Sequence, residues 1–291
     1  MSMQGTGSMG LGGVCVFNQS GGVLNATKYF ALPALSGSVG VATFTGGTAS
    51  MSSGGGSDIS ICDAGNSSTF GTFNVGTLAG GNAVVTANAS GAKGTRICTG
   101  ASTTGNLNLN SGTFVVNNWI YRNNATANAY VNFDGGTLQA GSTCAVLSNN
   151  LSAVYIYRDG AVMDSQGFVA TSFANLTSAP GNGIYPSGGG WAYASGAGYI
   201  GAPAVTVSGG SGSGAQAVAT ISSGQVTGVV LTCPGQNYVA GDMLTFAFSG
   251  GGATTPATSF MHTLTAGEVS ANAAGGLVKL GSGTLVESSA N

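Results

Sequence analysis

Histidine, the commonest general base and metal ligand, occurs once in this chain, at His262. A Ser-His-Asp triad or a histidine-based metal centre would depend on this one residue. His262 stands in the alternating segment FMHTLT (260–265), which is typical of a strand. We therefore interpret His262 as a surface strand residue and predict neither a catalytic residue nor a metal site.

Carboxylates are the next candidates, because paired Asp or Glu residues hydrolyse glycosides and clusters of them bind calcium. Asp134 and Asp159 each precede a glycine, at turns where an Asp side chain bonds nearby backbone N–H groups. Glu268 has a glutamine at its place in a similar upstream segment, which also favours a turn role. Asp58 and Asp63 flank a short strand, but their spacing matches no calcium-binding repeat. We predict that the protein is not an enzyme and uses no cofactor; a polysaccharide-degrading site is the alternative.

Five cysteines occur, at Cys15, Cys62, Cys98, Cys144 and Cys233, without any C-x-x-C pair. This spacing argues against zinc binding or a redox dithiol. Cys15 and Cys62, like Cys98 and Cys144, are separated by close to two turns of the repeat described below. Two turns are about 9–10 Å apart, too far for one disulfide. We expect most cysteines to be small core residues, with disulfides as the alternative; the odd number leaves at least one free or paired between chains.

Aromatic residues offer a binding hypothesis. Trp119 and Tyr121 would share one strand face, as would Tyr155 and Tyr157, because side chains alternate along a strand. Exposed pairs of this kind could stack on sugar rings. We favour the other interpretation, in which these pairs are buried aromatic stacks inside the coils of the fold.

The elements that must position these residues are strands. Only 6 Lys or Arg and 8 Asp or Glu occur among 291 residues, and the net charge of −2 excludes an electrostatic nucleic-acid binder. No apolar run is long enough for a membrane-spanning helix. Glycine is abundant, at 53 residues, while 43% of residues are hydrophobic, which is enough for a core. Helix-favouring Glu, Lys and Arg are scarce, so short strands joined by Gly-rich turns are expected.

A repeat of alternating residues, a Gly turn and a second alternating stretch covers the first half of the chain. Its clearest turn glycines are Gly22, Gly47, Gly112, Gly136 and Gly160, and weaker copies contain Gly71 and Gly94. Their period of roughly 24 residues predicts one coil of a parallel β-solenoid, because each coil buries its apolar side only by stacking. A meander of hairpins is the alternative.

The composition changes near Gly183, since 19 of the 22 Asn residues precede it. Beyond it, VTVSGG (205–210) is answered by FAFSGG (246–251), which indicates a tandem unit. We predict three parts: a solenoid of about seven coils over 1–182, a Gly-rich linker with tandem β units over 183–274, and a further strand repeat over 275–291.

The last segment, GGLVKLGSGTLVESSAN, resembles the autotransporter-associated β-strand repeat of large bacterial surface proteins. The matching residues are Gly276, Leu277, Lys279, Gly281, Gly283, Thr284, Leu285 and Asn291, while Glu287 and Ser289 depart from the pattern. The resemblance implies an all-β, right-handed parallel β-helix passenger. It also implies export to the cell surface or beyond, without enzymatic activity.

A solenoid exposes unpaired strand edges at its two ends, and natural proteins protect such edges with charge, proline or caps. We find none of these devices here. The sequence therefore predicts an extracellular structural or adhesive solenoid that forms a fibre with copies of itself or belongs to a longer surface passenger. A protein that binds surface polysaccharide, or a phage tail or fibre component, is the alternative.

Overall fold

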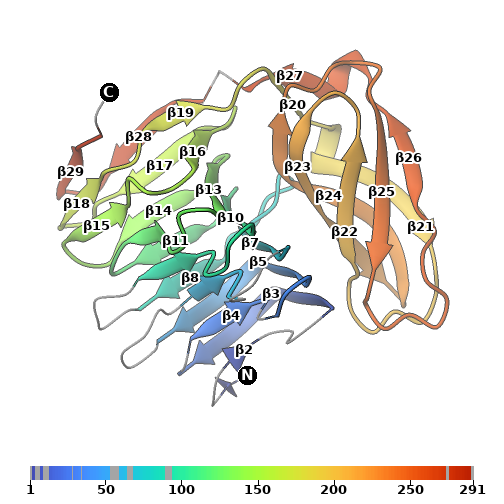
Figure 1. The fold of residues 1–291 in the computed structure, drawn as a ribbon, viewed down its shortest axis with the longest axis horizontal. Helices are drawn as coiled ribbons and strands as arrows, with labels where there is room; N and C mark the ends of the chain where they lie inside the picture. Colours follow the sequence, from blue (N-terminus) through green and yellow to red (C-terminus); the bar gives the residue numbers. More distant parts are fainter. Residues whose placement is uncertain are drawn as a thin grey trace.

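The computed structural model is nearly all β and consists of a parallel β-solenoid with an antiparallel β unit beside it (Figure 1). It describes residues 2–3, 7–8, 13–27, 29–33, 35–52, 59–63, 68–88, 94–272 and 275–289. The predicted fold class, an all-β parallel solenoid, is confirmed.

The solenoid has three stacks of parallel strands, one on each side of its coils. The first stack contains the first half of β3 (Val14–Ala26), the first half of β5 (Val39–Met51), β7 (Phe70–Val75), β10 (Thr104–Leu109), β13 (Asn128–Phe133), β16 (Ala153–Ile156) and β19 (Leu176–Ser178). The second stack contains β1 (Ser2–Met3), the second halves of β3 and β5, β8 (Val84–Ala87), β11 (Thr113–Val116), β14 (Thr137–Ala140), β17 (Ala161–Asp164) and β28 (Leu277–Leu280). The third stack contains β2 (Gly7–Ser8), β4 (Phe30–Leu32), β6 (Ile59–Ile61), β9 (Thr95–Ile97), β12 (Ile120–Arg122), β15 (Cys144–Leu147), β18 (Val169–Ser172) and β29 (Thr284–Glu287).

Alternation along each strand builds the core between these stacks. Leu107 and Leu109 of β10 point inward and are fully buried, and Phe73 and Val75 of β7 do the same one coil earlier. One continuous apolar cluster runs from Leu24 to Ala174. The buried aromatic stack inside it is made of phenylalanines, with Phe73 in contact with Phe30, Phe44 and Phe114.

Four of the five predicted turn glycines share one column between the first and second stacks. The strand register aligns Gly22, Gly47, Gly112 and Gly136, while Gly160 lies one residue earlier than this column. A Cβ on Gly47 would collide with the carbonyl oxygen of Gly22 in the preceding coil, and the backbone there has a positive φ of 74°. Glycine is needed at this corner because two backbones approach closely.

The weaker repeat copies are not equivalent turns. Gly71 lies inside β7, and Gly94 lies just before β9 of the third stack. The coils are also unequal, because the chain from Phe70 to its partner Thr104 is longer than the chain from Thr104 to its next partner, Asn128. Part of the extra length is the turn around Leu78, whose N–H donates to the Leu231 carbonyl of the neighbouring unit at 2.9 Å. The longer coil thus reaches the neighbouring unit through this turn.

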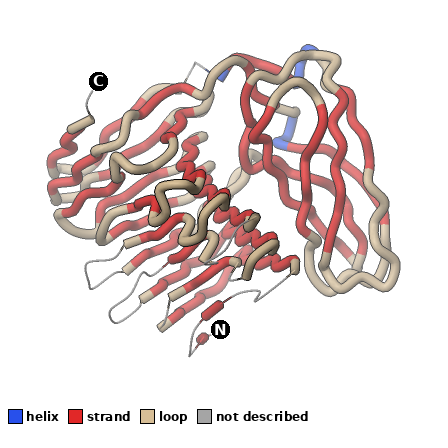
Figure 2. Tube along the Cα trace, in the orientation of Figure 1, coloured by secondary structure: helices blue, strands red, loops and turns tan. Residues whose placement is uncertain are grey.

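The antiparallel unit, which we call the insertion, interrupts the last coil between β19 and β28 (Figures 1 and 2). Its neck pairs β20 (Asn182–Ile184) with β27 (Val269–Ala271). Its sheet has the order β21-β24-β23-β22-β25-β26. The elements are η1 (Ser187–Gly189), β21 (Gly190–Ser195), β22 (Ala204–Gly209), β23 (Ser213–Ser222), β24 (Gln225–Gln236), β25 (Met243–Ser249), β26 (Phe260–Thr263) and η2 (Ala266–Glu268).

The C-terminal strand repeat is part of the solenoid and not a separate unit. Leu277–Leu280 pair with β17, and Thr284–Glu287 pair with β18, so this segment completes the coil that the insertion interrupts. The two similar segments within 183–274 lie side by side in one sheet, because β22 and β25 are antiparallel neighbours.

Candidate functional site: a cleft between the solenoid and the insertion

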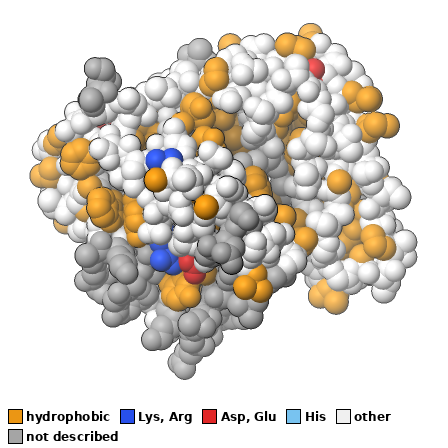
Figure 3. Space-filling view, in the orientation of Figure 1, with side chains coloured by type: hydrophobic (Ala, Val, Ile, Leu, Met, Phe, Trp, Pro, Cys, Tyr) orange, Lys and Arg blue, Asp and Glu red, His pale blue; other side chains and the backbone are white. Residues whose placement is uncertain are grey.

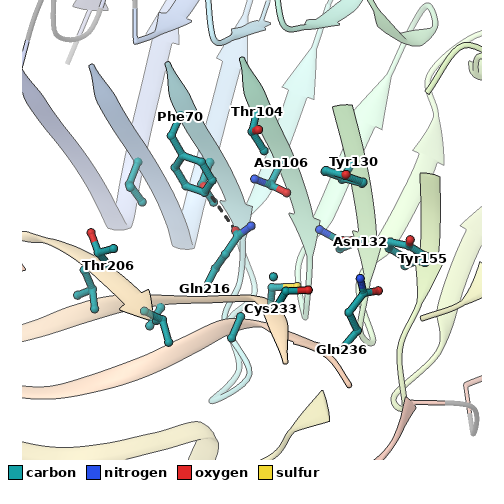
Figure 4. Close-up of a pocket in the computed structure, with 18 of the residues that line it drawn as sticks. Phe70, Thr104, Asn106, Tyr130, Asn132, Tyr155, Thr206, Gln216, Cys233 and Gln236 are labelled. Atoms are coloured by element: carbon teal, nitrogen blue, oxygen red, sulfur yellow. Dashed lines mark hydrogen bonds between the residues drawn. The ribbon is translucent and has the colours of Figure 1, made fainter. Parts of the chain in front are cut away.

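A cleft of about 530 Å³ lies between the outer face of the first stack and the insertion strands β22, β23 and β24 (Figure 4). The solenoid wall is formed by Val39, Val41, Phe70, Thr72, Thr104, Asn106, Tyr130, Asn132, Tyr155 and Tyr157. The insertion wall is formed by Val205, Thr206, Val207, Ser213, Gly214, Ala215, Gln216, Ala217, Cys233 and Gln236. The solenoid wall thus takes residues from five successive coils, so the cleft runs along the stack and across its strands.

The same alternation that fills the core builds the solenoid wall. Leu107 and Leu109 point inward, so Asn106 and Asn108 on the same strand point outward toward the insertion. Asn108 Nδ2 donates to Asn74 Oδ1 at 2.8 Å, and Asn132 Nδ2 donates to Asn108 Oδ1 at 2.8 Å. This ladder of amides on consecutive coils fixes Asn132, which lines the cleft.

Hydrogen bonds between the solenoid and the insertion fix the two walls relative to each other. Asn108 Nδ2 donates to Gln216 Oε1 at 2.8 Å, and Asn110 Nδ2 donates to the Thr232 carbonyl at 3.0 Å. Figure 3 shows few charged side chains on the face of the molecule that is in view. The cleft is therefore built by defined hydrogen bonds between two regions that are distant in sequence.

Two tyrosines form an aromatic surface in the cleft. The rings of Tyr130 and Tyr155 stack with centroids 6.3 Å apart and an interplanar angle of 14°. Tyr157 lies next to Tyr155 in an edge-to-face arrangement and is almost fully buried, with its hydroxyl 3.4 Å from the Cys233 thiol. Burial raises the pKa of Tyr130 and of Tyr157, so both phenols stay neutral.

The cleft also contains polar atoms that lack partners. Asn106 Nδ2 on the solenoid wall and Gln236 Oε1 on the insertion wall are buried and make no hydrogen bond among the described residues. A buried amide without a partner costs free energy, so such atoms are rare in folded proteins. Here one unsatisfied donor and one unsatisfied acceptor belong to two residues that line the same cleft.

The structure separates the predicted aromatic pairs. Tyr155 and Tyr157 line the cleft, whereas Trp119 and Tyr121 lie at the third stack, with their rings 5.4 Å apart. Trp119 is 38% exposed but does not line the cleft. No motif in the sequence singled out the wall residues Phe70, Asn106, Asn132, Gln216 and Gln236. The excess of Asn before Gly183 was the available signal for the amides.

None of the carboxylates in the described part of the chain lines the cleft. Asp134 follows β13 and accepts a hydrogen bond from the backbone N–H of Asp159, one coil later, at 2.8 Å. Burial raises the pKa of Asp134 to about 7. The Asp134 side chain thus bonds a backbone N–H, as predicted for a turn residue. That N–H belongs to the next coil and not to the turn of Asp134 itself. A smaller hollow, lined by Arg158, Asp159, Tyr185 and Gly189 among others, lies beside the neck.

The single histidine belongs to a structural cluster in the insertion. His262 Nε2 lies 2.9 Å from Glu268 Oε1, and the same carboxylate accepts a hydrogen bond from Trp191 Nε1 at 2.6 Å. Partial burial alone would raise the pKa of Glu268. Hydrogen bonds from Thr265, Trp191 and His262 outweigh this effect and lower the pKa to about 2. Asp58 lies outside the described residues. No group of three potential metal ligands is found in the described part of the chain.

The residues that resemble the autotransporter repeat form one corner of the last coil. Lys279 in β28 donates to the Gly281 and Gly283 carbonyls in the turn before β29. Gly281 has a φ of 79°, and a Cβ on Gly283 would collide with the Phe168 carbonyl oxygen. Gly276, Leu277, Thr284 and Leu285 flank this turn, and Asn291 lies outside the described residues.

No helix among the described residues has the length and hydropathy needed to cross a membrane. A scan of protein-family models found no match to this chain, and neither did searches of curated proteins and of solved structures. The likeness of 275–291 to the autotransporter-associated strand repeat therefore stays a prediction from sequence.

Proposed function

We propose that this protein is a non-enzymatic, extracellular β-solenoid whose cleft binds a neutral carbohydrate. The observation that carries the proposal is the pair of unpartnered buried amide atoms, on Asn106 and Gln236, in a cleft that also holds stacked tyrosines. A sugar hydroxyl both donates and accepts hydrogen bonds, so it suits both atoms. Tyrosine faces pack against the apolar side of a sugar ring.

The charge of the cleft selects among ligand classes. Among the residues that the structure describes, none that lines the cleft is acidic, basic or a histidine. A charged ligand would lose its hydration without gaining an opposite charge, which is costly. The absence of a carboxyl group among these residues also favours binding over glycoside hydrolysis, which uses two carboxylates.

The experiment is isothermal titration calorimetry of the purified full chain with neutral glycans found as hits on an array. Tyr155→Ala removes the stacking face, and we expect at least a tenfold loss of affinity, or about 1.4 kcal/mol. Tyr121→Ala, an aromatic of the third stack outside the cleft, is the matched control and should bind normally. Equal binding by both variants, or binding only of acidic glycans, would contradict the proposal.

Self-association is the second candidate, and it is favoured by the last coil. Its strands β28 and β29 expose apolar side chains, with Val278 51% and Leu280 48% exposed. We propose that another copy of the chain adds strands at this edge, as in other strand-addition complexes. Sedimentation of the wild type across a concentration series should show oligomers that Val278→Lys abolishes. Monomers at every concentration would contradict this proposal.

A further inference from the structure

Two buried cysteines meet at one corner of the solenoid. Cys62 directly follows β6 and Cys98 directly follows β9, which are neighbouring strands of the third stack. Ile61 pairs with Ile97, and the N–H of Thr99 donates to the Cys62 carbonyl at 3.0 Å. The two cysteines therefore occupy the same position on consecutive coils. Their spacing in the sequence did not predict these equivalent positions, because the coil between them is longer than the usual repeat.

The backbone turns both side chains into the same space. Cys62 has a φ of 58° and Cys98 a φ of 60°, and each residue is fully buried. A Cβ on Gly71 would lie 2.8 Å from the Cys62 sulfur, and a Cβ on Gly105 would lie 3.0 Å from the Cys98 sulfur. Gly71 and Gly105 are themselves partners in the first stack. Two matching glycines thus leave room for two matching sulfurs.

The two thiols are neighbours. The interaction with Cys62 lowers the pKa of Cys98, whereas burial raises the pKa of Cys62 well above its usual range. Neighbouring parallel strands lie about 4.8 Å apart, within the separation of about 4.4–6.8 Å between the Cα atoms of a disulfide. No other pair of the described cysteines follows equivalent strands on consecutive coils.

We propose that Cys62 and Cys98 form a disulfide that clamps two coils when the chain folds in the presence of a disulfide oxidant such as oxidised glutathione. The Cys98 thiolate attacks one glutathione sulfur, breaks the glutathione S–S bond and releases one glutathione thiolate, which takes up a proton. The Cys62 thiolate then attacks the Cys98 sulfur of the mixed disulfide and releases the second glutathione thiolate, which is protonated in turn. Two cysteine thiols are oxidised by two electrons, and one oxidised glutathione is reduced to two thiols.

The reaction occurs during folding, before the corner closes over the sulfurs. A disulfide here persists in an oxidising compartment. It would therefore suit a protein that functions outside the cell, although its formation in vitro does not depend on the carbohydrate proposal.

The test is refolding of the full chain from denaturant in a glutathione redox buffer, followed by alkylation of free thiols and peptide mass spectrometry. We expect a linked peptide pair containing Cys62 and Cys98, and a melting temperature higher by about 5–10 °C than that of reduced protein. Five alkylated thiols, or a link between any other pair, would overturn the proposal.

Variants separate a clamp from general sensitivity to oxidation. Cys62→Ala and Cys98→Ala should each abolish the shift in melting temperature between oxidised and reduced protein. Cys15→Ala, which removes one half-buried thiol elsewhere, should keep that shift. The wild-type peptide map decides the question even where a variant fails to fold. A shift retained in Cys62→Ala would also refute the clamp.

Discussion

The solenoid and the insertion bury apolar side chains in different ways. In the solenoid, parallel strands repeat one coil position above another, so phenylalanines and amides each form columns. In the insertion, antiparallel strands form one six-stranded sheet. Its apolar side chains form two separate clusters, and Val205 contacts both of them. Stacking of coils therefore gives a regular polar wall. The insertion supplies a second, irregular wall, and the cleft lies between the two.

The largest expected effect tests whether the two regions have independent cores. Phe73→Ala empties a fully buried site in the solenoid, and Phe246→Ala does the same in the insertion. Each should lower the free energy of unfolding by about 3–5 kcal/mol. Hydrogen exchange measured by mass spectrometry should show lost protection mainly in the region that carries the change. Equal loss across both regions would mean that they unfold as one unit.

The next effect concerns the close approach of consecutive coils at the turn glycines of the solenoid. Gly47→Ala places a methyl group against the Gly22 carbonyl and should destabilise the solenoid by about 2–4 kcal/mol. Gly22→Ala is the matched control, since its φ is also positive, at 71°, but open space surrounds it. We expect its cost to be about 1 kcal/mol in urea denaturation. Equal costs would show that backbone strain alone matters.

Acid and base should affect the two regions in opposite directions. In the solenoid, the folded-state pKa of Asp134, about 7, lies above its unfolded value of about 3.9. The contribution of Asp134 to the free energy of unfolding is fully present below about pH 3.9 and is lost as pH rises through 7. Asp134→Asn keeps the hydrogen-bond acceptor for Asp159 without the charge, so it should raise stability at pH 8 by about 1–3 kcal/mol. No gain at pH 8 relative to pH 5 in urea denaturation would contradict this.

In the insertion, the folded-state pKa of Glu268, about 2, lies below its unfolded value of about 4.3. The contribution of Glu268 to the free energy of unfolding is present at pH values above the unfolded-state pKa and is lost as pH falls toward 2. Glu268→Gln should therefore cost about 1–2 kcal/mol at pH 7 and nothing near pH 2. Trp191 fluorescence reports the effect, because its indole N–H donates to this carboxylate. A cost that does not change with pH would refute the charge-based explanation.

The sequence predicted the repeat well where each coil has the same length. Gly112 and Gly136 could be found because one full repeat separates them and the register between their strands is regular. Gly71 and Gly94 were misleading, because glycine is so common that a chance match fits the period. The turn around Leu78 could not be foreseen, since it contacts Leu231 of β24, which lies far along the chain.

Of the cleft, the sequence supplied Tyr155 and Tyr157 but not their partners. Alternation showed that the two tyrosines lie on one face, yet it gave the same answer for Trp119 and Tyr121. The insertion covers the first stack and not the third, and that difference separates the two pairs. Gln216 and Gln236 carry no local pattern that would assign them to a site.

By itself, the sequence determined an all-β chain, because scarce helix formers, frequent glycine and alternating apolar residues leave little else. It also favoured parallel stacking over a meander of hairpins, since repeated coils bury their apolar side only against one another. Only the tertiary structure decided that residues 275–289 close the coil left open at β19, and that Cys62 faces Cys98. Both depend on register between distant strands, which is set by the summed packing of the whole stack rather than by any local pattern.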